Sequence, residues 1–448
     1  MAPETDSARS ASVSAAGTAT HQDPASQHVG DRRDGGDGKV SGSRSGHGRA
    51  ILTRVKDVAD DPDYRWSALA MFFQGCGMGS GMPFIGLFLV QRLHASTSTA
   101  GLFFTTALVG ALVSYGTGML SDRYRRRLAL ARFSCLWLAA GWLALSMVGH
   151  TWTVFVIGFV FFCFIGTLIS QQYAHLHDVM DARRTQQRTG VLGVVRAAYS
   201  VGWAVGPAVG SWLSTGVGFG AAFRVTAVVY LLGLLCLTRM TARRPRPGTP
   251  GRDGAQPSPR VSRAVLLGPV LVAAGCSIVL SGDSTRLTFL PIELGSVLHL
   301  GPGIVGTVMS IPPVLEIVVI PAAGLLADRY GSAPILVGGS ACGAAGFCAL
   351  ALSDTTMVFF LGQALVAVMV AATVSVGPAY AQRLAPAHIG VATSVYFGAV
   401  SLSSGLGGVV GGYSASVLGV PKLFLVPVAG CLVAMLFLVL ASRSRRAR

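Results

Sequence analysis

The chain has 448 residues, of which 52% are hydrophobic and only 12% are charged, and its mean hydropathy is +0.59. This balance excludes a soluble globular protein of this length, because too few charged residues remain to cover its surface. The formal net charge of +16 does not indicate a nucleic-acid binder, since the basic residues lie in loops between apolar runs. Each run reaches about 20 residues, the length that spans a bilayer as a helix.

The basic residues fall in alternate loops. The loops on one side are rich in arginine, whereas the loops on the other side carry little beyond Arg92, Arg224 and Lys422. By the positive-inside rule, the arginine-rich side faces the cytoplasm, and both chain termini lie there. The sequence therefore predicts a multi-pass protein of the plasma membrane, with the lipid bilayer as its surroundings.

Taken in order, the chain divides into two halves of similar pattern. Residues 1–60 lack apolar periodicity and predict a disordered cytoplasmic tail. An all-α, polytopic fold follows, with twelve helices in two pseudo-symmetric six-helix bundles at 61–241 and 264–442. A cytoplasmic linker rich in Pro, Gly and Arg occupies 242–263, and 443–448 form a basic cytoplasmic tail. The expected helices cover 65–90, 99–121, 128–149, 152–175, 189–213, 221–241, 264–294, 303–327, 333–352, 356–382, 389–417 and 421–442.

One short pattern occurs in both halves. The run GMLSDRYRRR begins at Gly118, and GLLADRYG begins at Gly324, each at the end of an apolar run. Two copies of Gly-x-Leu-small-Asp-Arg-Tyr indicate a duplicated unit. An aspartate at the C-terminal end of a helix opposes the helix dipole and needs a compensating partner, and the glycine lets another helix approach closely. The residues that carry this pattern are Gly118, Asp122, Arg123, Arg126, Gly324, Asp328 and Arg329.

The pattern resembles the loop motif between the second and third helices of the major facilitator superfamily, a large family of membrane transporters. Arg125 stands where that family usually has glycine, and the second copy keeps Gly331 but lacks the basic run. The resemblance implies the twelve-helix fold of that family and transport by alternating access, and we expect a monomer. In this reading Asp122 stabilises the state that is closed on the cytoplasmic side.

The fifth expected helix carries a second pattern. Gly202, Gly206 and Gly210 are spaced four residues apart and form a flat face for close helix packing. Pro207 weakens the helix locally. The stretch resembles the Gly-x-x-x-Gly-Pro motif of exporters in the same superfamily, although Ser211 replaces a final glycine. Ordinary packing of small residues, with no implication for transport direction, is the alternative interpretation.

Four charged residues lie well inside expected spans, where each needs a partner or a water-filled cavity. Asp283 and Arg286 are three residues apart on one helix and are close enough to pair. Arg196 and Glu316 lie on helices of different halves. In one interpretation Asp283–Arg286 is a structural pair and Arg196–Glu316 is a pair that ties the halves together. In the other, Glu316 or Asp283 is a proton-coupling residue.

Three stretches give a closer resemblance, which is to the bacterial sugar efflux transporter family. They are the helix that contains Arg196, the helix start around Gly101, and Glu316-Ile317. That family exports sugars and glycosides, so the resemblance implies a bacterial plasma membrane, a small sugar or glycoside as substrate, and protons as the coupled ion. Amides, phenols and an indole suit a polyhydroxylated ligand, although they also bond helices together. The candidate substrate-binding residues are Gln74, Gln171, Tyr199, Trp203, Gln363 and Tyr396.

Two other functions compete with sugar export. A multidrug/proton antiporter of the same superfamily fits the helix pattern equally well, but aromatic residues are only 8% of the chain. An enzyme or a sensor is the third interpretation. No phosphate-binding loop or nucleophile–base pair is recognisable, and the eight cysteines lie inside apolar runs without metal-type spacing. We therefore expect a transporter that is not an enzyme, with no cofactor, metal or nucleic-acid partner.

Overall fold

The computed structural model describes residues 56, 58–124, 126–183, 185, 188–241, 263–352 and 355–446. Contacts divide the chain into Met1–Arg49 and Ala50–Arg448, and every described residue belongs to the second unit. Most of the expected tail 1–60 and nearly all of the expected linker 242–263 lie outside the described residues. Within the described ranges all regular elements are helices, and 12 of them are long and apolar enough to cross a membrane.

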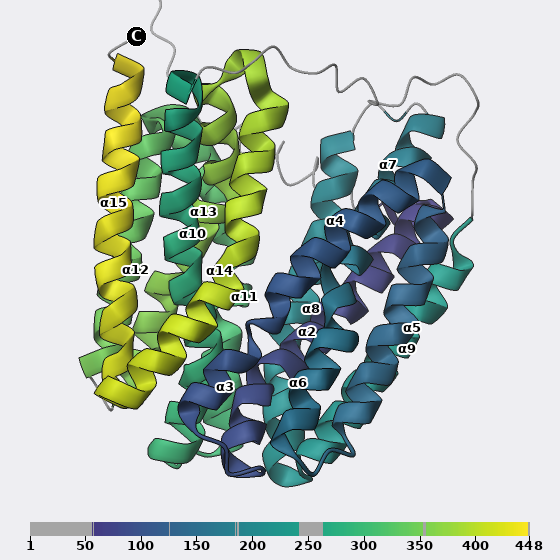
Figure 1. Ribbon diagram of the computed structural model, residues 1–448. Coiled ribbons are helices and arrows are strands. Elements are labelled where there is room, and N and C mark those ends of the chain that lie inside the picture. The colour runs from purple at the N-terminus through teal and green to yellow at the C-terminus, as the bar shows by residue number, and fades with distance from the viewer. Residues whose placement is uncertain are drawn as a thin grey trace, which may run out of the picture. The chain divides into compact units, whose positions relative to one another are not determined.

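The helices of the first half form one group in the purple-to-teal part of the ribbon (Figure 1). The second expected helix consists of α3 and α4, and the fourth consists of α6, a 3-10 turn at Phe162–Phe164, and α7. These elements are α2 (Pro62–Gln91), α3 (Thr97–Phe103), α4 (Thr106–Tyr124), α5 (Arg127–Leu145), α6 (Thr151–Val160), α7 (Ile165–Ala182), α8 (Arg188–Gly216) and α9 (Phe219–Arg239).

The second half repeats the arrangement with longer, less interrupted helices. A short π-helix, Glu293–Val297, follows the first of them directly. The elements are α10 (Arg263–Ile292), α11 (Pro302–Tyr330), α12 (Ser332–Leu352), α13 (Thr356–Leu384), α14 (Ile389–Leu418) and α15 (Leu425–Arg446).

The predicted end of the fourth span at residue 175 is wrong, because α7 continues to Ala182. Leu176, Val179 and Met180 recur at helical spacing and are fully buried against the start of α2. Their burial extends the helix beyond the apolar run that spans the membrane. The third span is shorter than predicted, since α5 ends at Leu145 rather than near 149.

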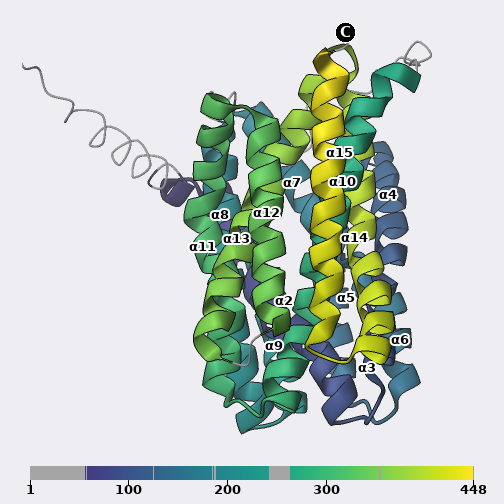
Figure 2. The ribbon, with the colours of Figure 1, turned by 90° about the vertical axis from the view of Figure 1, so that its left-hand side faces the viewer.

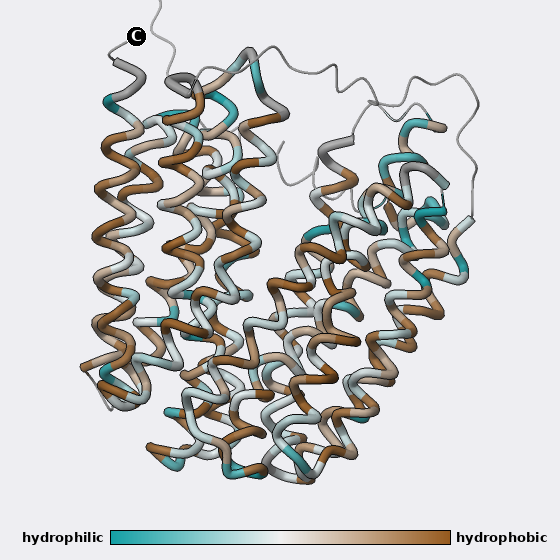
Figure 3. The backbone as a smooth tube through the Cα atoms, in the orientation of Figure 1, coloured by the Kyte–Doolittle hydropathy of each residue, from teal (hydrophilic) through white to brown (hydrophobic). Residues whose placement is uncertain are grey.

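The surface that the helices present outward is apolar. Large hydrophobic side chains such as Leu112, Met147 and Val318 are more than two-thirds exposed. Figure 3 shows hydrophobic residues along the helices, with hydrophilic residues more frequent towards helix ends and loops. Such a surface is stable in lipid, where the helices satisfy their own backbone hydrogen bonds.

Direct contacts between the halves occur at the end of the helices away from the arginine-rich loops. Gln91 Nε2 at the end of α2 donates to Ser296 Oγ at 3.0 Å, and Ser211 Oγ on α8 donates to the Pro302 carbonyl at 2.7 Å. Figures 1 and 2 both place α3 beside α14 at the end opposite the C-terminus, where Gly101 packs against the α14 backbone.

The end that carries the arginine-rich loops is packed differently. A Cβ atom added at Gly116 or Gly118 of α4, or at Gly324 of α11, would meet no atom within 4 Å. The close helix approach expected at Gly118 is therefore absent from this conformation. The two halves meet through α2–α10, α8–α11 and α3–α14, and the contacts detailed above all lie at the other end.

Candidate functional site

A chain of amide hydrogen bonds lies inside the first half. Gln74 Nε2 on α2 donates to Gln172 Oε1 on α7 at 2.6 Å, and Gln172 Nε2 donates to the backbone carbonyl of Ser67 at 3.0 Å. Gln74 and Gln172 are both buried. The Gln74 Oε1 atom is buried without a hydrogen-bond partner. The relay therefore leaves one acceptor available for a group that is not part of the described protein.

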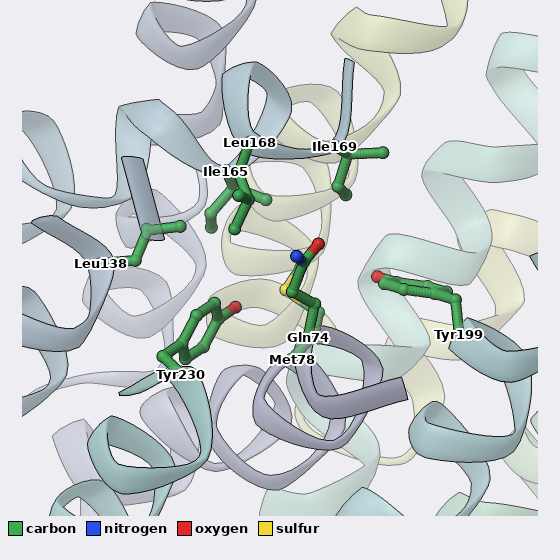
Figure 4. Close-up of a pocket in the computed structure, with 8 residues that line it drawn as sticks. All are labelled: Gln74, Met78, Leu138, Ile165, Leu168, Ile169, Tyr199 and Tyr230. Atoms are coloured by element: carbon green, nitrogen blue, oxygen red, sulfur yellow. The ribbon is translucent and has the colours of Figure 1, made fainter. Parts of the chain in front are cut away.

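The acceptor faces a small, partly open cavity. A cavity of about 10 Å³ is lined by residues of α2, α5, α7, α8 and α9. Figure 4 shows the hydroxyls of Tyr199 and Tyr230 pointing towards the Gln74 amide from opposite sides. Leucine and isoleucine side chains close the remaining walls. The cavity therefore has a polar centre and apolar walls and holds one water-sized group.

The second half contains an ion pair in place of neutral amides. Arg286 Nε and one of its terminal nitrogens donate to Asp283 Oδ1 at 2.9 and 2.7 Å, as the three-residue spacing predicted. The other terminal nitrogen donates to Gln363 Oε1 on α13 at 2.8 Å. Arg286 is only 3% exposed, so its charge is compensated by these two partners rather than by water.

Glu316 on α11 belongs to the same electrostatic neighbourhood. Arg196, Asp283 and Arg286 all lie close enough to act on its charge. In this conformation Glu316 is half-buried and Arg196 is exposed, and no ion pair within 4.0 Å joins the two among the described residues. Arg196 lies close to the Tyr173 hydroxyl instead. A carboxylate without a direct ion pair is the group whose charge responds most readily to movement of its neighbours.

Tyr199 and Trp203 lie between the amide relay and the charged residues. Both side chains are half-buried on α8, and the Trp203 indole lies close enough to the Tyr199 hydroxyl to affect its ionisation. Tyr199 is also close enough to Glu316 to experience its charge. Because Glu316 belongs to the other half, Tyr199 faces the interface between the two bundles.

The other predicted substrate-binding residues use their polar atoms inside the protein. Gln171 Oε1 accepts from Ser121 Oγ at 2.5 Å, and the Tyr396 hydroxyl donates to the Thr373 carbonyl at 2.9 Å. Gln363 is fully buried beside Arg286. The structure therefore brings together Gln74, Tyr199 and Trp203, whereas Gln171 and Tyr396 lie in separate contacts.

The glycines of the α8 motif support very close packing of α8 on α2. A side chain at Gly202 would clash with the Phe72 carbonyl oxygen, and one at Gly210 would clash with the Ser80 carbonyl oxygen. Gly206 lies against Gly79 in the same contact. The flat face predicted from the glycine spacing is confirmed, and α8 continues as a helix through Pro207.

The structure describes more of the second copy of the loop pattern than of the first. The side chains of Asp122 and Arg123 and the whole of Arg125 lie outside the described residues, while Arg126 is exposed. In the second copy Asp328 accepts from Arg383 at 3.1 Å, which supplies the cationic partner expected at a helix C-terminus. Gly331 ends α11 with φ of +94°, a conformation that favours glycine.

Several contacts were not predicted from the sequence. They are the Gln74–Gln172–Ser67 relay, the Arg286–Gln363 bond, and the Ser211 bond to the other half. Ser211 was visible only as a departure from the glycine pattern. No group of three His, Cys, Asp or Glu side chains suited to a metal ion occurs in the ranges that the structure describes.

The chain matches the family described as Major Facilitator Superfamily over residues 67–292 and 277–448. Among similar curated proteins, sugar efflux transporter A of Dickeya chrysanthemi is 27% identical over 374 residues, covering 82% of this chain and 93% of that relative. A putative sugar efflux transporter of Deinococcus radiodurans is 28% identical, covering 84% of this chain and 97% of its own length. Multidrug resistance protein MdtG of Serratia proteamaculans is 26% identical and covers 60% of this chain and 66% of that relative.

Solved structures share the fold at low sequence identity. A peptide transporter, POT, in complex with sulfate superposes with a TM-score of 0.70 and 14% identity, covering 86% of this chain and 95% of that chain. The nucleoside transporter NupG superposes with a TM-score of 0.66 and 14% identity, covering 85% of this chain and 98% of that chain. These likenesses support the twelve-helix architecture and carry no argument about substrate.

Proposed function

This chain belongs to the Major Facilitator Superfamily, and from that premise we propose that it exports sugars or glycosides across the bacterial plasma membrane in exchange for protons. It is a multi-pass membrane transporter and not an enzyme. The proposal rests chiefly on one observation. Relatives named as sugar efflux transporters align with 73–84% of the chain and 83–97% of their own length, whereas the multidrug relative aligns with 60% of the chain and 66% of its own length.

The chemistry of the interior supports a polyhydroxylated ligand. An amide acceptor, two phenols and an indole lie between the two bundles or just inside the first. Such groups exchange hydrogen bonds with sugar hydroxyls, and an indole offers a flat face to a sugar ring. Gln171, Gln363 and Tyr396 support this surface from behind in our proposal, because one oxygen of each already bonds to a protein group.

Coupling to protons is assigned to the charged residues. Glu316 carries the proton in this proposal, with Arg196, Asp283 and Arg286 as the charges that favour or disfavour its ionisation as the halves move. The loops that contain Arg126 and Arg329 face the cytoplasm, as do both termini. The packing of the halves at the opposite end then corresponds to a conformation closed towards the outside.

Transport into everted membrane vesicles tests the function directly. A labelled methyl glucoside and a lipophilic cationic dye are offered side by side, with the vesicle interior acidic. We expect glucoside uptake that rises with the imposed pH gradient and little dye uptake. Uptake of the dye without the glucoside would replace this proposal with the multidrug/proton antiporter, the function that the partial match to MdtG supports.

A further inference from the structure

The orientation of the Gln74 amide is fixed by a group that cannot be reversed. A backbone carbonyl only accepts hydrogen bonds, so the Gln172 atom that contacts the Ser67 carbonyl at 3.0 Å must be the amide nitrogen. The Gln172 oxygen then faces Gln74, and the Gln74 nitrogen must donate to it at 2.6 Å. The remaining Gln74 atom, Oε1, is consequently a hydrogen-bond acceptor.

This acceptor is directed into the cavity and is only satisfied if a donor enters. Gln74 is 2% exposed, and its Oε1 has no partner, which is a costly state for a buried polar atom. The Tyr199 hydroxyl points towards it but does not bond to it directly (Figure 4). The cavity of about 10 Å³ has room for one water-sized group between them.

The two sides of the cavity differ in accessibility. Leu138, Leu168 and Tyr230 are buried and form its floor, whereas Met78, Ile169 and Tyr199 are half-buried and form its rim. The rim tyrosine is close to Glu316 of the other half. The cavity is therefore approached from the interface between the bundles.

The polar groups define the chemistry of the occupant. The Tyr199 hydroxyl points towards the cavity and can donate its proton to a group placed there (Figure 4). A group placed between Gln74 Oε1 and Tyr199 must donate to the first and accept from the second. A hydroxyl does both, whereas an ether or a methyl group cannot donate.

We propose that Gln74, Tyr199 and Tyr230 form a receptor for a single hydroxyl of the transported glycoside, held in orientation by Gln172 and Ser67. This inference rests on the proposed sugar export and adds the group of the sugar that is recognised. Gln172 acts as a positioning residue, because it holds the Gln74 acceptor towards the cavity. A site built to bond a hydroxyl strongly rejects an analogue that lacks it.

The test uses the full-length protein in everted vesicles with labelled methyl glucoside and its monodeoxy analogues at each ring position. In the unmodified protein, we expect one analogue to be transported at least about tenfold less well than the parent. Tyr199→Phe and Gln74→Met should remove the discrimination against that analogue alone. Gln172→Met should weaken the same discrimination. Gln382→Met, a glutamine that donates to Thr393 on α14, is the matched control and should keep the full pattern.

Three outcomes decide the proposal. Collapse of discrimination at one sugar position in the Gln74 and Tyr199 variants supports it. An unchanged pattern in both variants, with normal glucoside transport, overturns it and leaves the cavity as the site of a bound water only. Absence of transport of every glucoside by the unmodified protein contradicts the proposed function itself and this inference with it. Because Tyr199→Phe removes only a hydroxyl, it keeps the test decisive if Gln74→Met fails to fold.

Discussion

The polar cluster around Gln74 in the first bundle differs in kind from the cluster around Arg286 in the second. The first bundle buries neutral amides, with Gln74 bonded to Gln172 and one acceptor left over. The second cluster pairs the buried Arg286 with the half-buried Asp283, and Glu316 lies near this ion pair. Amides keep their hydrogen-bonding character at every pH, whereas carboxylates change theirs when a proton binds. We infer that the first bundle recognises the substrate and the second senses the proton.

The two clusters should also differ in how well they tolerate substitution. Loss of one amide partner leaves a neutral group unsatisfied, which costs about 1–3 kcal/mol. Loss of one member of a buried ion pair leaves an uncompensated charge and costs about 3–5 kcal/mol. Substitutions in the second bundle should accordingly affect folding more than equivalent ones in the first.

The largest effect is expected from Arg286→Met. This change leaves the half-buried Asp283 without its cation, and we expect a loss of about 3 kcal/mol and little folded protein. The double variant with Asp283→Leu removes both charges and should recover much of the stability. Thermal unfolding of the purified protein in detergent measures both. If Arg286→Met were as stable as the unmodified protein, the claim that the second bundle tolerates substitution less well than the first would be contradicted.

A smaller effect is expected where the two bundles are joined. Ser211→Ala removes the hydroxyl that donates to the Pro302 carbonyl at 2.7 Å, and one such bond contributes about 1 kcal/mol. The balance between conformations should shift about fivefold towards closure at the arginine-rich end. Spin labels at Leu120 and Phe397, both exposed on α4 and α14, report the distance there.

The control for this prediction is Ser416→Ala, which removes a hydroxyl bonded within α14 to the Tyr413 carbonyl. It should leave the distance distribution unchanged. Equal shifts in both variants would show that the Ser211 bond does not specifically hold the halves together at that end.

The sequence predicted the features that depend on local spacing. The twelve spans follow from runs of apolar residues, the Asp283–Arg286 pair from a three-residue interval, and the α2–α8 contact from glycines four residues apart. Each needs only the geometry of one helix. The end of α7 was missed because Val179 and Met180 continue the helix by burial outside the apolar run.

The site depends on how helices are rotated against each other, which the sequence does not record. Gln171 and Gln172 are adjacent and differ by about 100° around α7. Gln171 bonds to Ser121 on α4, and Gln172 bonds to Gln74 on α2. Either glutamine fits a list of polar candidates, and only tertiary packing determines which one supports the cavity.

The division of roles between the bundles is tested most directly by comparing Tyr199→Phe with Glu316→Gln in the same vesicles. Two quantities are measured: the methyl glucoside concentration that half-saturates exchange, and the stimulation of transport by a pH gradient. Tyr199→Phe should raise the half-saturating concentration of methyl glucoside and leave the stimulation by a pH gradient unchanged. Glu316→Gln should abolish the stimulation by a pH gradient while exchange continues. Glu316→Asp should restore part of that stimulation. If both variants altered both quantities, or if Glu316→Gln kept full stimulation by the pH gradient, the separation of recognition from coupling would be contradicted.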